Sequence, residues 1–281
     1  MRLKVLGSAS SQGIPQPFCT CLTCAKASGR NQRLRSSYLV ELISGPSILL
    51  DACPDWRQQH LASRFEFDYL FLSHRHRDHI SGLGEIRTAL EAHDKKRTQF
   101  QKQRAFLLGS TLNRWLTDKQ RDSRWEESVQ QAYQQLLSRK FFRQTVLIPF
   151  KKVALNRNLT ITYIRGRHGN NYCGGLVIKE DNNSLVYLAD ISNFNDKLKS
   201  YLSKINPDLV IAHVPFFYSP REKIEKERHA GVEKAKKLPG KKVLLSHFSH
   251  RVKLKHKELV EEAKKIDKRF VIAYDNQEIV I

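Results

Sequence analysis

The sequence predicts an α/β fold, an αββα sandwich in which two β-sheets pack face to face between outer helices. Short apolar runs of strand length fill the first quarter of the chain and return after residue 145, with helical patterns between and after them. A chain of 281 residues can bury a large core. We therefore expect one domain over residues 1–281, with a basic helical insertion at about residues 90–140.

The first half of the chain begins with strand patterns and then becomes helical. Four apolar runs of strand length lie at residues 3–7, 37–42, 47–51 and 69–73. Gly45-Pro46 separates the second run from the third, which indicates a hairpin. From about residue 84 to 143 the pattern is polar and helical, and Val129, Tyr133 and Leu136 fall on one helix face.

The second half alternates strands with helices. Strand patterns are expected at residues 145–148, 159–164, 175–178, 184–188, 209–212, 242–246, 270–274 and 278–281. Helices are expected at residues 222–237 and 254–266. Two strand-rich halves that flank a helical segment favour one sandwich over two independent domains.

The composition is that of a globular protein with a strong basic excess. Hydrophobic residues make up 40% of the chain, and no apolar stretch reaches the ~20 residues that span a bilayer. The first residues lack the apolar region of a secretory signal, so we expect a cytoplasmic protein with no membrane partner. The net charge of +21 favours a polyanionic partner such as a nucleic acid, but solvated lysine faces on helices would give the same excess. The sequence leaves this choice, and that between monomer and homodimer, open.

One short segment concentrates metal-binding side chains. It directly follows the apolar run at residues 69–73 and contains His74, His76, Asp78 and His79. Imidazole and carboxylate groups suit Zn²⁺, Mn²⁺ or Fe²⁺. One isolated histidine could be an ordinary core residue, but three histidines around one aspartate indicate a metal site. We therefore predict a metal site in the loop at the end of a strand.

The pattern His-x-His-x-Asp-His, followed by the glycines of Ser81-Gly82-Leu83-Gly84, resembles the signature of the metallo-β-lactamase superfamily. The resemblance implies the αββα metallo-β-lactamase sandwich and two metal ions. It assigns His74 and His76 to one ion and Asp78 and His79 to the other.

The same resemblance implies three later ligands, each after a strand. His168 would join the first metal, Asp190 would bridge both metals, and His247 would join the second. Asp51 matches a buried aspartate that supports the metal loop. Taken alone, each of the later three could be a loop histidine, a helix cap or a surface histidine.

Two adjacent divalent ions suit the hydrolysis of a phosphate ester, because they lower the pKa of a bridging water and neutralise the phosphoryl oxygens. Asp78 or a nearby histidine could protonate the leaving group. By resemblance His229 reaches toward the substrate phosphate, and His213 is a second candidate that lies out of register with the family position. An ordinary core or surface histidine is the alternative for both.

A second metal site is expected near the N-terminus. Cys19, Cys21 and Cys24 supply three thiolates, and His250, three residues after His247, offers the fourth donor of a tetrahedral structural zinc. Cys53 and Cys173 lie in apolar surroundings and are expected to be buried. The cysteine group and the last histidine resemble the phosphoribosyl 1,2-cyclic phosphate phosphodiesterase branch, which holds such a zinc and whose active site favours manganese.

The sequence therefore predicts a hydrolase with two active-site ions, Mn²⁺ or Zn²⁺, and one structural Zn²⁺. The leading hypothesis is a phosphodiesterase that acts on a cyclic phosphate or another small phosphoester. The alternative is a nuclease resembling the transfer-RNA 3′-processing enzymes, in which the basic segment grips the RNA backbone. A third hypothesis is a zinc-stabilised binding module with an idle centre.

Overall fold

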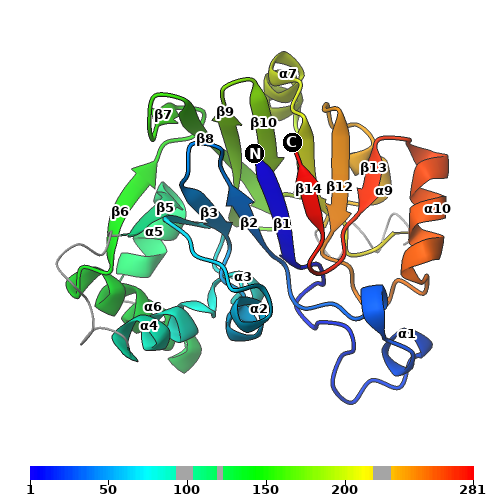
Figure 1. Cartoon of the computed structure of the whole chain (residues 1–281), viewed down its shortest axis with the longest axis horizontal. Helices are drawn as coiled ribbons and strands as arrows, with labels where there is room; N and C mark the ends of the chain where they lie inside the picture. Colours follow the sequence, from blue (N-terminus) through cyan, green and yellow to red (C-terminus); the bar gives the residue numbers. More distant parts are fainter. Residues whose placement is uncertain (93–103, 119–122, 218–228) are drawn as a thin grey trace.

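The computed structural model describes residues 1–92, 104–118, 123–217 and 229–281. Within these ranges, a pair of seven-stranded β-sheets pack face to face (Figure 1). The predicted αββα sandwich is confirmed. Helices cover the outer faces of both sheets, and the two ends of the chain meet in the first sheet, where β14 pairs with β1.

The first sheet has the strand order β14-β1-β2-β3-β4-β5-β6. Its strands β3 to β6 run parallel to one another, whereas β14, β1, β2 and β3 are antiparallel neighbours. The strands are β1 (Arg2–Gly7), β2 (Ser37–Glu41), β3 (Ser47–Leu50), β4 (Tyr69–Leu72), β5 (Arg104–Gly109), β6 (Phe142–Leu147) and β14 (Glu278–Val280). The hairpin expected around Gly45-Pro46 is formed by β2 and β3.

The second sheet has the strand order β13-β12-β11-β10-β9-β8-β7. Its strands β10 to β13 are parallel, and β8 and β9 form a long antiparallel hairpin. The strands are β7 (Lys152–Ala154), β8 (Leu159–His168), β9 (Asn171–Glu180), β10 (Asn183–Tyr187), β11 (Leu209–His213), β12 (Lys242–Ser246) and β13 (Phe270–Ile272).

The helices form two groups. The first group contains α2 (Trp56–Ser63), α3 (Arg77–Ile80), α4 (Leu83–Ala92), α5 (Ser110–Thr117) and α6 (Arg124–Ser138). The second contains α7 (Asp196–Ile205), α9 (Val232–Ala235) and α10 (His256–Ile266), and α1 (Leu22–Ala25) lies in the N-terminal loop with a 3-10 turn at Gly29–Asn31. Among the described residues, no helix combines the length and apolar character that a membrane crossing requires.

The core is divided between the two faces of the first sheet. On one face, between the two sheets, Val5, Tyr38 and Leu50 lie opposite Leu176 and Ile211, and all five are fully or almost fully buried. On the other face, the core lies between the first sheet and the helices α2, α4, α5 and α6. Both faces of β2 to β5 are therefore covered, which fixes the strand ends that carry the site.

The predicted helical insertion is not wholly helical, because Arg104–Gly109 forms the strand β5 between β4 and β6. Ala105 to Leu108 are at most 2% exposed, since they lie in a parallel sheet that is covered on both faces. The predicted stripe of Val129, Tyr133 and Leu136 is confirmed on α6. Of the helix expected at 222–237, the structure describes α9 (Val232–Ala235), and residues 218–228 lie outside the described residues.

Candidate metal centre

The predicted ligands and the catalytic candidate His213 come from the carboxyl ends of four strands and from one hairpin. The His74–His79 loop follows β4, Asp190 follows β10, His213 ends β11 and His247 follows β12, while His168 ends β8 in the β8–β9 hairpin. Carboxyl ends of parallel strands meet at one edge of a sheet, so these side chains converge although 173 residues separate the first from the last.

Three strand ends near the site turn through left-handed backbone. Asp51 after β3, Ala189 after β10 and His247 after β12 have φ angles of 61°, 47° and 67°. For residues with a Cβ atom this conformation costs about 1 kcal/mol or more, and such strain collects at functional sites. The sharp turns stop the strands and direct Asp51, Asp190 and His247 toward the centre.

The first group of donors consists of His74, His76, His168 and Asp190, whose donor atoms all lie within 4.8 Å of one another. The Nε2 atoms of His74 and His168 lie 3.7 and 3.8 Å from Oδ2 of Asp190. Nε2 of His74 is buried and has no hydrogen-bond partner among the residues described. A buried nitrogen without a partner is costly, and a metal ion would satisfy it.

The second group of donors consists of His79, Asp190, His213 and His247, and the predicted ligand Asp78 lies beside it. Nε2 of His79 lies 3.4 Å from Oδ2 of Asp78 and 3.5 Å from Oδ2 of Asp190. Nε2 of His247 lies 3.7 Å from Oδ2 of Asp78 and 3.6 Å from Oδ1 of Asp190. Nε2 of His79 is also buried without a hydrogen-bond partner in the described ranges of the chain.

The charges of the centre fit divalent cations. Asp51, Asp78 and Asp190 are buried, and none of them pairs with a lysine or arginine among the described residues. Burial lowers the pKa of His74 well below its ordinary value and that of His76 to about 4, so both rings are neutral and have a lone pair at pH 7. Neutral imidazoles beside ionised carboxylates are the state that binds zinc or manganese.

Asp51 supports the second group from behind. It is fully buried, and its Oδ2 accepts hydrogen bonds from His79 Nδ1 at 2.6 Å, Tyr187 Oη at 2.6 Å and Ser73 Oγ at 2.7 Å. Its Oδ1 accepts from the backbone N–H of Ser73 at 2.7 Å. Burial alone would lower the pKa of His79, but Asp78, Asp190 and Asp51 raise it well above its usual value, so a metal ion bound at Nε2 would replace a proton there.

His213 lies beneath the centre. Its Nδ1 is 2.7 Å from Oδ1 of Asp190, and its Nε2 is 3.0 Å from the hydroxyl of Tyr38, so both ring nitrogens have partners. The ring is 2% exposed and stacks on His247 at a centroid distance of 4.4 Å. His213 therefore orients Asp190, and the sequence alone did not indicate Tyr38 as its partner.

The centre opens into a cavity of about 210 Å³. His229 lines this cavity, with its ring centroid 4.5 Å from that of His168, and its Nδ1 has no partner among the described residues. Ser10, Ser249 and Arg251 line it as well. These three were not predicted, because nothing in their local sequence indicates that the N-terminal turn and the loop after β12 reach the same cavity.

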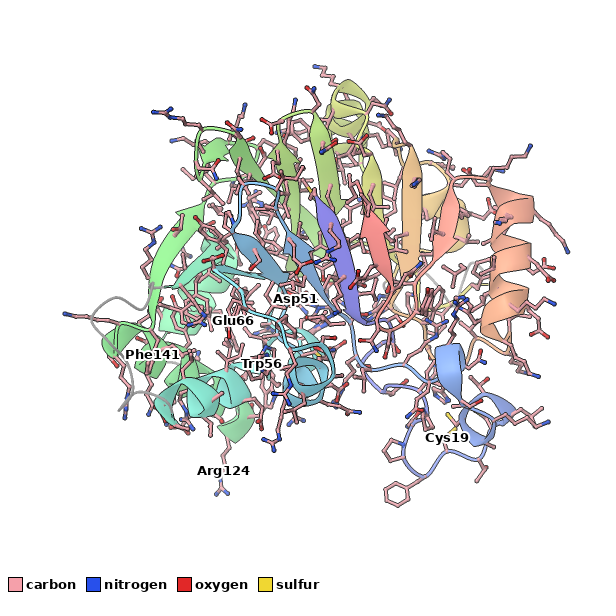
Figure 2. The ribbon with its side chains drawn as sticks, viewed as in Figure 1. Cys19, Asp51, Trp56, Glu66, Arg124 and Phe141 are labelled. Atoms are coloured by element: carbon pink, nitrogen blue, oxygen red, sulfur yellow. The ribbon has the colours of Figure 1, made fainter. Side chains whose placement is uncertain are left out.

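The predicted cysteine group also comes together. Sγ of Cys19 and Cys21 lie 3.4 and 3.6 Å from Nδ1 of His250, and Cys24 belongs to the same cluster. With zinc bonds of about 2.3 Å to sulfur and about 2.1 Å to nitrogen, a tetrahedral site holds these donors about 3.6 Å apart. The cluster therefore fits zinc; Figure 2 shows Cys19 in the N-terminal loop beside α1. The other two cysteines, Cys53 and Cys173, are buried as predicted.

Comparison with known families agrees with this geometry. The model of the β-lactamase superfamily domain matches residues 47–248, a segment that includes all seven predicted active-site ligands. The chain belongs to the metallo-β-lactamase superfamily. It is thus a hydrolase of the metallo-β-lactamase fold, a class whose members use divalent metals.

Solved structures share the fold over the whole chain. A diphosphatase of the PhnP family is 21% identical with a TM-score of 0.75, covering 100% of this chain and 97% of its own. Zinc-bound PqqB from Methylobacterium extorquens is 15% identical with a TM-score of 0.76, and each chain is covered completely. The short form of human tRNase Z is 16% identical with a TM-score of 0.69, covering 100% of this chain and 99% of its own.

One curated protein is related over a shorter segment. An octanoyltransferase from Porphyromonas gingivalis is 39% identical over 89 residues. The match covers 31% of this chain and 18% of the relative, so the chain spans less than a fifth of the length of that protein.

Proposed function

We propose that the protein is a metal-dependent phosphodiesterase that cleaves a cyclic phosphate or another small phosphoester. The observation that carries this proposal is the pair of donor groups that share Asp190 at the floor of a cavity of about 210 Å³. Two divalent ions held there, Mn²⁺ or Zn²⁺, would supply a low-pKa water and neutralise phosphoryl charge.

The two ions would have separate protein ligands and one shared ligand. His74, His76 and His168 would hold one ion, and Asp78, His79 and His247 would hold the other, with Asp190 facing both groups.

Other residues of the cavity would act on the substrate. The imidazole of His229 can hydrogen-bond the oxygen of the leaving group, and the guanidinium of Arg251 can contact the phosphoryl oxygens. Burial alone would raise the pKa of Asp78, but His79 and His247 beside it hold that pKa below its usual range. An ionised Asp78 is a ligand and has no proton to give, so we assign proton donation to His229 and orientation of Asp190 to His213.

Two of the structural neighbours support phosphoester chemistry. The names of the PhnP-family diphosphatase and of human tRNase Z both denote cleavage at phosphorus. At 21% and 16% identity they share the fold, and a fold alone does not assign a substrate. The cysteine group with His250 favours the cyclic phosphodiesterase branch, and we propose that it holds one structural Zn²⁺.

Metal analysis combined with hydrolysis assays tests this proposal. We expect one tightly held zinc and up to two exchangeable ions per chain, and turnover of cyclic and linear phosphodiesters that a chelator abolishes. His76→Ala should lose activity and keep its cooperative unfolding. If the protein held its full complement of metal but hydrolysed no phosphodiester, the phosphodiesterase proposal would be refuted. The binding-module hypothesis would then remain.

A second candidate is an RNA-processing nuclease. The net charge of +21 favours it, as do Arg165 and Arg167, which lie exposed over Tyr172 on the hairpin that carries His168. A nuclease that neutralises several phosphates loses affinity steeply with salt, whereas a small substrate responds weakly. Measuring KM for a short RNA and for a cyclic mononucleotide at two salt concentrations separates the two.

A further inference from the structure

A cavity of about 520 Å³ lies on the helix-covered face of the first sheet. Residues of α2 and α4 line it, together with Arg104 at the start of β5. No described residue lines both this cavity and the cavity of the metal centre. Sites for small molecules commonly have volumes of about 300–1,000 Å³, so this cavity is large enough for a small organic ligand.

Much of the cavity wall is apolar. Trp56, Phe65 and Ile86 line it and are at most 7% exposed, whereas Leu61 of α2 also lines it and is 51% exposed. Figure 2 shows Trp56 near α2, on the face of the first sheet that the helices cover. The apolar part of a ligand would cover these side chains and remove Leu61 from water, which favours binding.

Two ring nitrogens in the same wall lack partners. Nε1 of Trp56 and Nδ1 of His60 are buried, and neither forms a hydrogen bond within the described part of the chain. The two rings stack at a centroid distance of 5.2 Å, and the ring of Phe65 meets both at a steep angle, which fixes their positions. An indole N–H can only donate, so the group that would satisfy Trp56 is a hydrogen-bond acceptor.

The charged residues of the cavity favour an anion. Arg57 and Arg64 line it, and neither forms an ion pair with a described residue. Arg104 also lines it but pairs with Glu66 at 2.8 Å, and Glu85 is the other carboxylate of the wall. The positive charges therefore exceed the negative ones, and a guanidinium group binds a carboxylate in a geometry that matches both.

We propose that this cavity is a binding site for a small carboxylate with an apolar body, of the fatty-acid type. The carboxylate would pair with Arg57 or Arg64 and accept a hydrogen bond from Trp56, while the apolar body would cover Leu61 and Ile86. The proposal goes beyond the hydrolytic function and does not depend on it, because the two cavities are lined by different residues.

The place of the cavity also predicts what a bound ligand does to the fold. The helix α2 follows the turn at Asp51, and α4 follows the His74–His79 loop. Backbone hydrogen bonds join the segments before the two helices, from Ala52 to the carbonyl of His79 at 2.9 Å and from Gly82 to the carbonyl of Ala52 at 2.8 Å. A ligand that contacts both helices binds the folded state alone, so it should raise the unfolding temperature.

Three probes with one apolar body and different head groups test the proposal. Decanoate should raise the unfolding temperature and bind saturably, and decanol should bind about tenfold or more weakly than decanoate, because the charged hydrogen bonds are lost. Decylammonium should bind more weakly than decanol. If decanol binds as tightly as decanoate, the cavity is merely apolar and the proposal is overturned.

Fluorescence shows whether decanoate binds in this cavity. Of the three tryptophans, Trp56 lines the cavity, whereas Trp115 and Trp125 do not. Decanoate should change the emission of the parent, and Trp56→Phe should abolish this change. Calorimetry should show that Trp56→Phe also weakens decanoate about tenfold, because the ring is kept but the N–H is lost. An unaltered emission change in Trp56→Phe would place the bound decanoate elsewhere and overturn the proposal.

Arginine variants complete the test without disturbing the core. Arg57 and Arg64 are exposed, so replacing both by glutamine should leave the unfolding temperature of the ligand-free protein unchanged. The double variant should bind decanoate about tenfold more weakly and decanol as before. The matched control is Arg157→Gln, which changes an exposed arginine of the loop between β7 and β8 and should bind decanoate like the parent. Parent-like decanoate affinity in the double variant refutes the proposal, whether or not the protein hydrolyses phosphodiesters.

Discussion

Replacing Asp51 by asparagine tests how the support of the metal loop works. The carboxylate accepts four hydrogen bonds, from the N–H and Oγ of Ser73, from Nδ1 of His79 and from Oη of Tyr187, and it is fully buried. Three of the four reach Oδ2. Asparagine has one oxygen and one NH₂ group, so if its oxygen takes the Oδ2 position, the NH₂ group faces the N–H of Ser73.

The magnitude follows from this count. The best arrangement of Asp51→Asn loses one hydrogen bond to a charged acceptor, about 1.5–3 kcal/mol of unfolding free energy. At about 2–4 °C per kcal/mol, the unfolding temperature falls by roughly 3–12 °C. The charge that favours the Nδ1–H form of His79 is also lost, and removal of such a partner lowers metal affinity about 10- to 100-fold.

Two measurements separate these effects. Chelator competition gives metal affinity, and thermal unfolding with and without EDTA gives stability. Tyr187→Phe is the matched control, since it removes one donor to Asp51 but leaves the carboxylate and its contact with His79. We expect Tyr187→Phe to lower the unfolding temperature and to change metal affinity less than about threefold. Parent-like metal affinity in Asp51→Asn would refute the reasoning.

Four further outcomes are expected. His229→Ala should lower kcat about 100-fold or more with unchanged metal content by mass spectrometry, since it removes a proton donor and no ligand. Gly7→Ala should cost about 1–3 kcal/mol in denaturant unfolding, because its Cβ would lie 2.0 Å from the Arg35 carbonyl oxygen, whereas Gly84→Ala, with nothing within 4 Å, should not destabilise. Cys24→Ser should remove one zinc per chain and lower the unfolding temperature by roughly 5 °C or more. Burial and nearby arginines lower the pKa of His256 to about 4. The neutral ring therefore stabilises the fold above pH 6.5, and this stabilisation is lost as the pH falls from 6.5 to 4. The difference in unfolding free energy between the parent and His256→Gln should shrink over that range.

The sequence predicts most of the fold because its strands are marked locally. The apolar runs before Asp51 and His74 and the turn at Gly45-Pro46 are each readable within a few residues. The strand Arg104–Gly109 was not predicted, because it is a short apolar run inside a basic helical region. Its pairing with β4 and β6 in the sheet makes it a strand. The pairing of β14 with β1 joins opposite ends of the chain and leaves no local signal.

The candidate site was also predictable only in part. The convergence of candidate ligands at strand ends could be predicted, because the His74–His79 pattern indicates a metal and the later residues follow strands in order. The direction in which a side chain points could not be predicted, so the sequence did not distinguish the roles of His213 and His229. In the structure His213 contacts Asp190 and Tyr38, whereas His229 lines the cavity.

The loop after β12 links the two candidate metal sites. It carries His247 for the active centre, His250 for the cysteine cluster and Arg251 for the cavity wall. Its Phe248 exchanges backbone hydrogen bonds with Ser8 and Ser10 at 2.9 and 3.0 Å, which joins it to the turn that forms the opposite wall. A zinc ion on His250 would thus fix the position of His247 three residues earlier. Because a misplacement of about 1 Å can cost a hundredfold in rate, a structural zinc in this loop would also be a condition for catalysis.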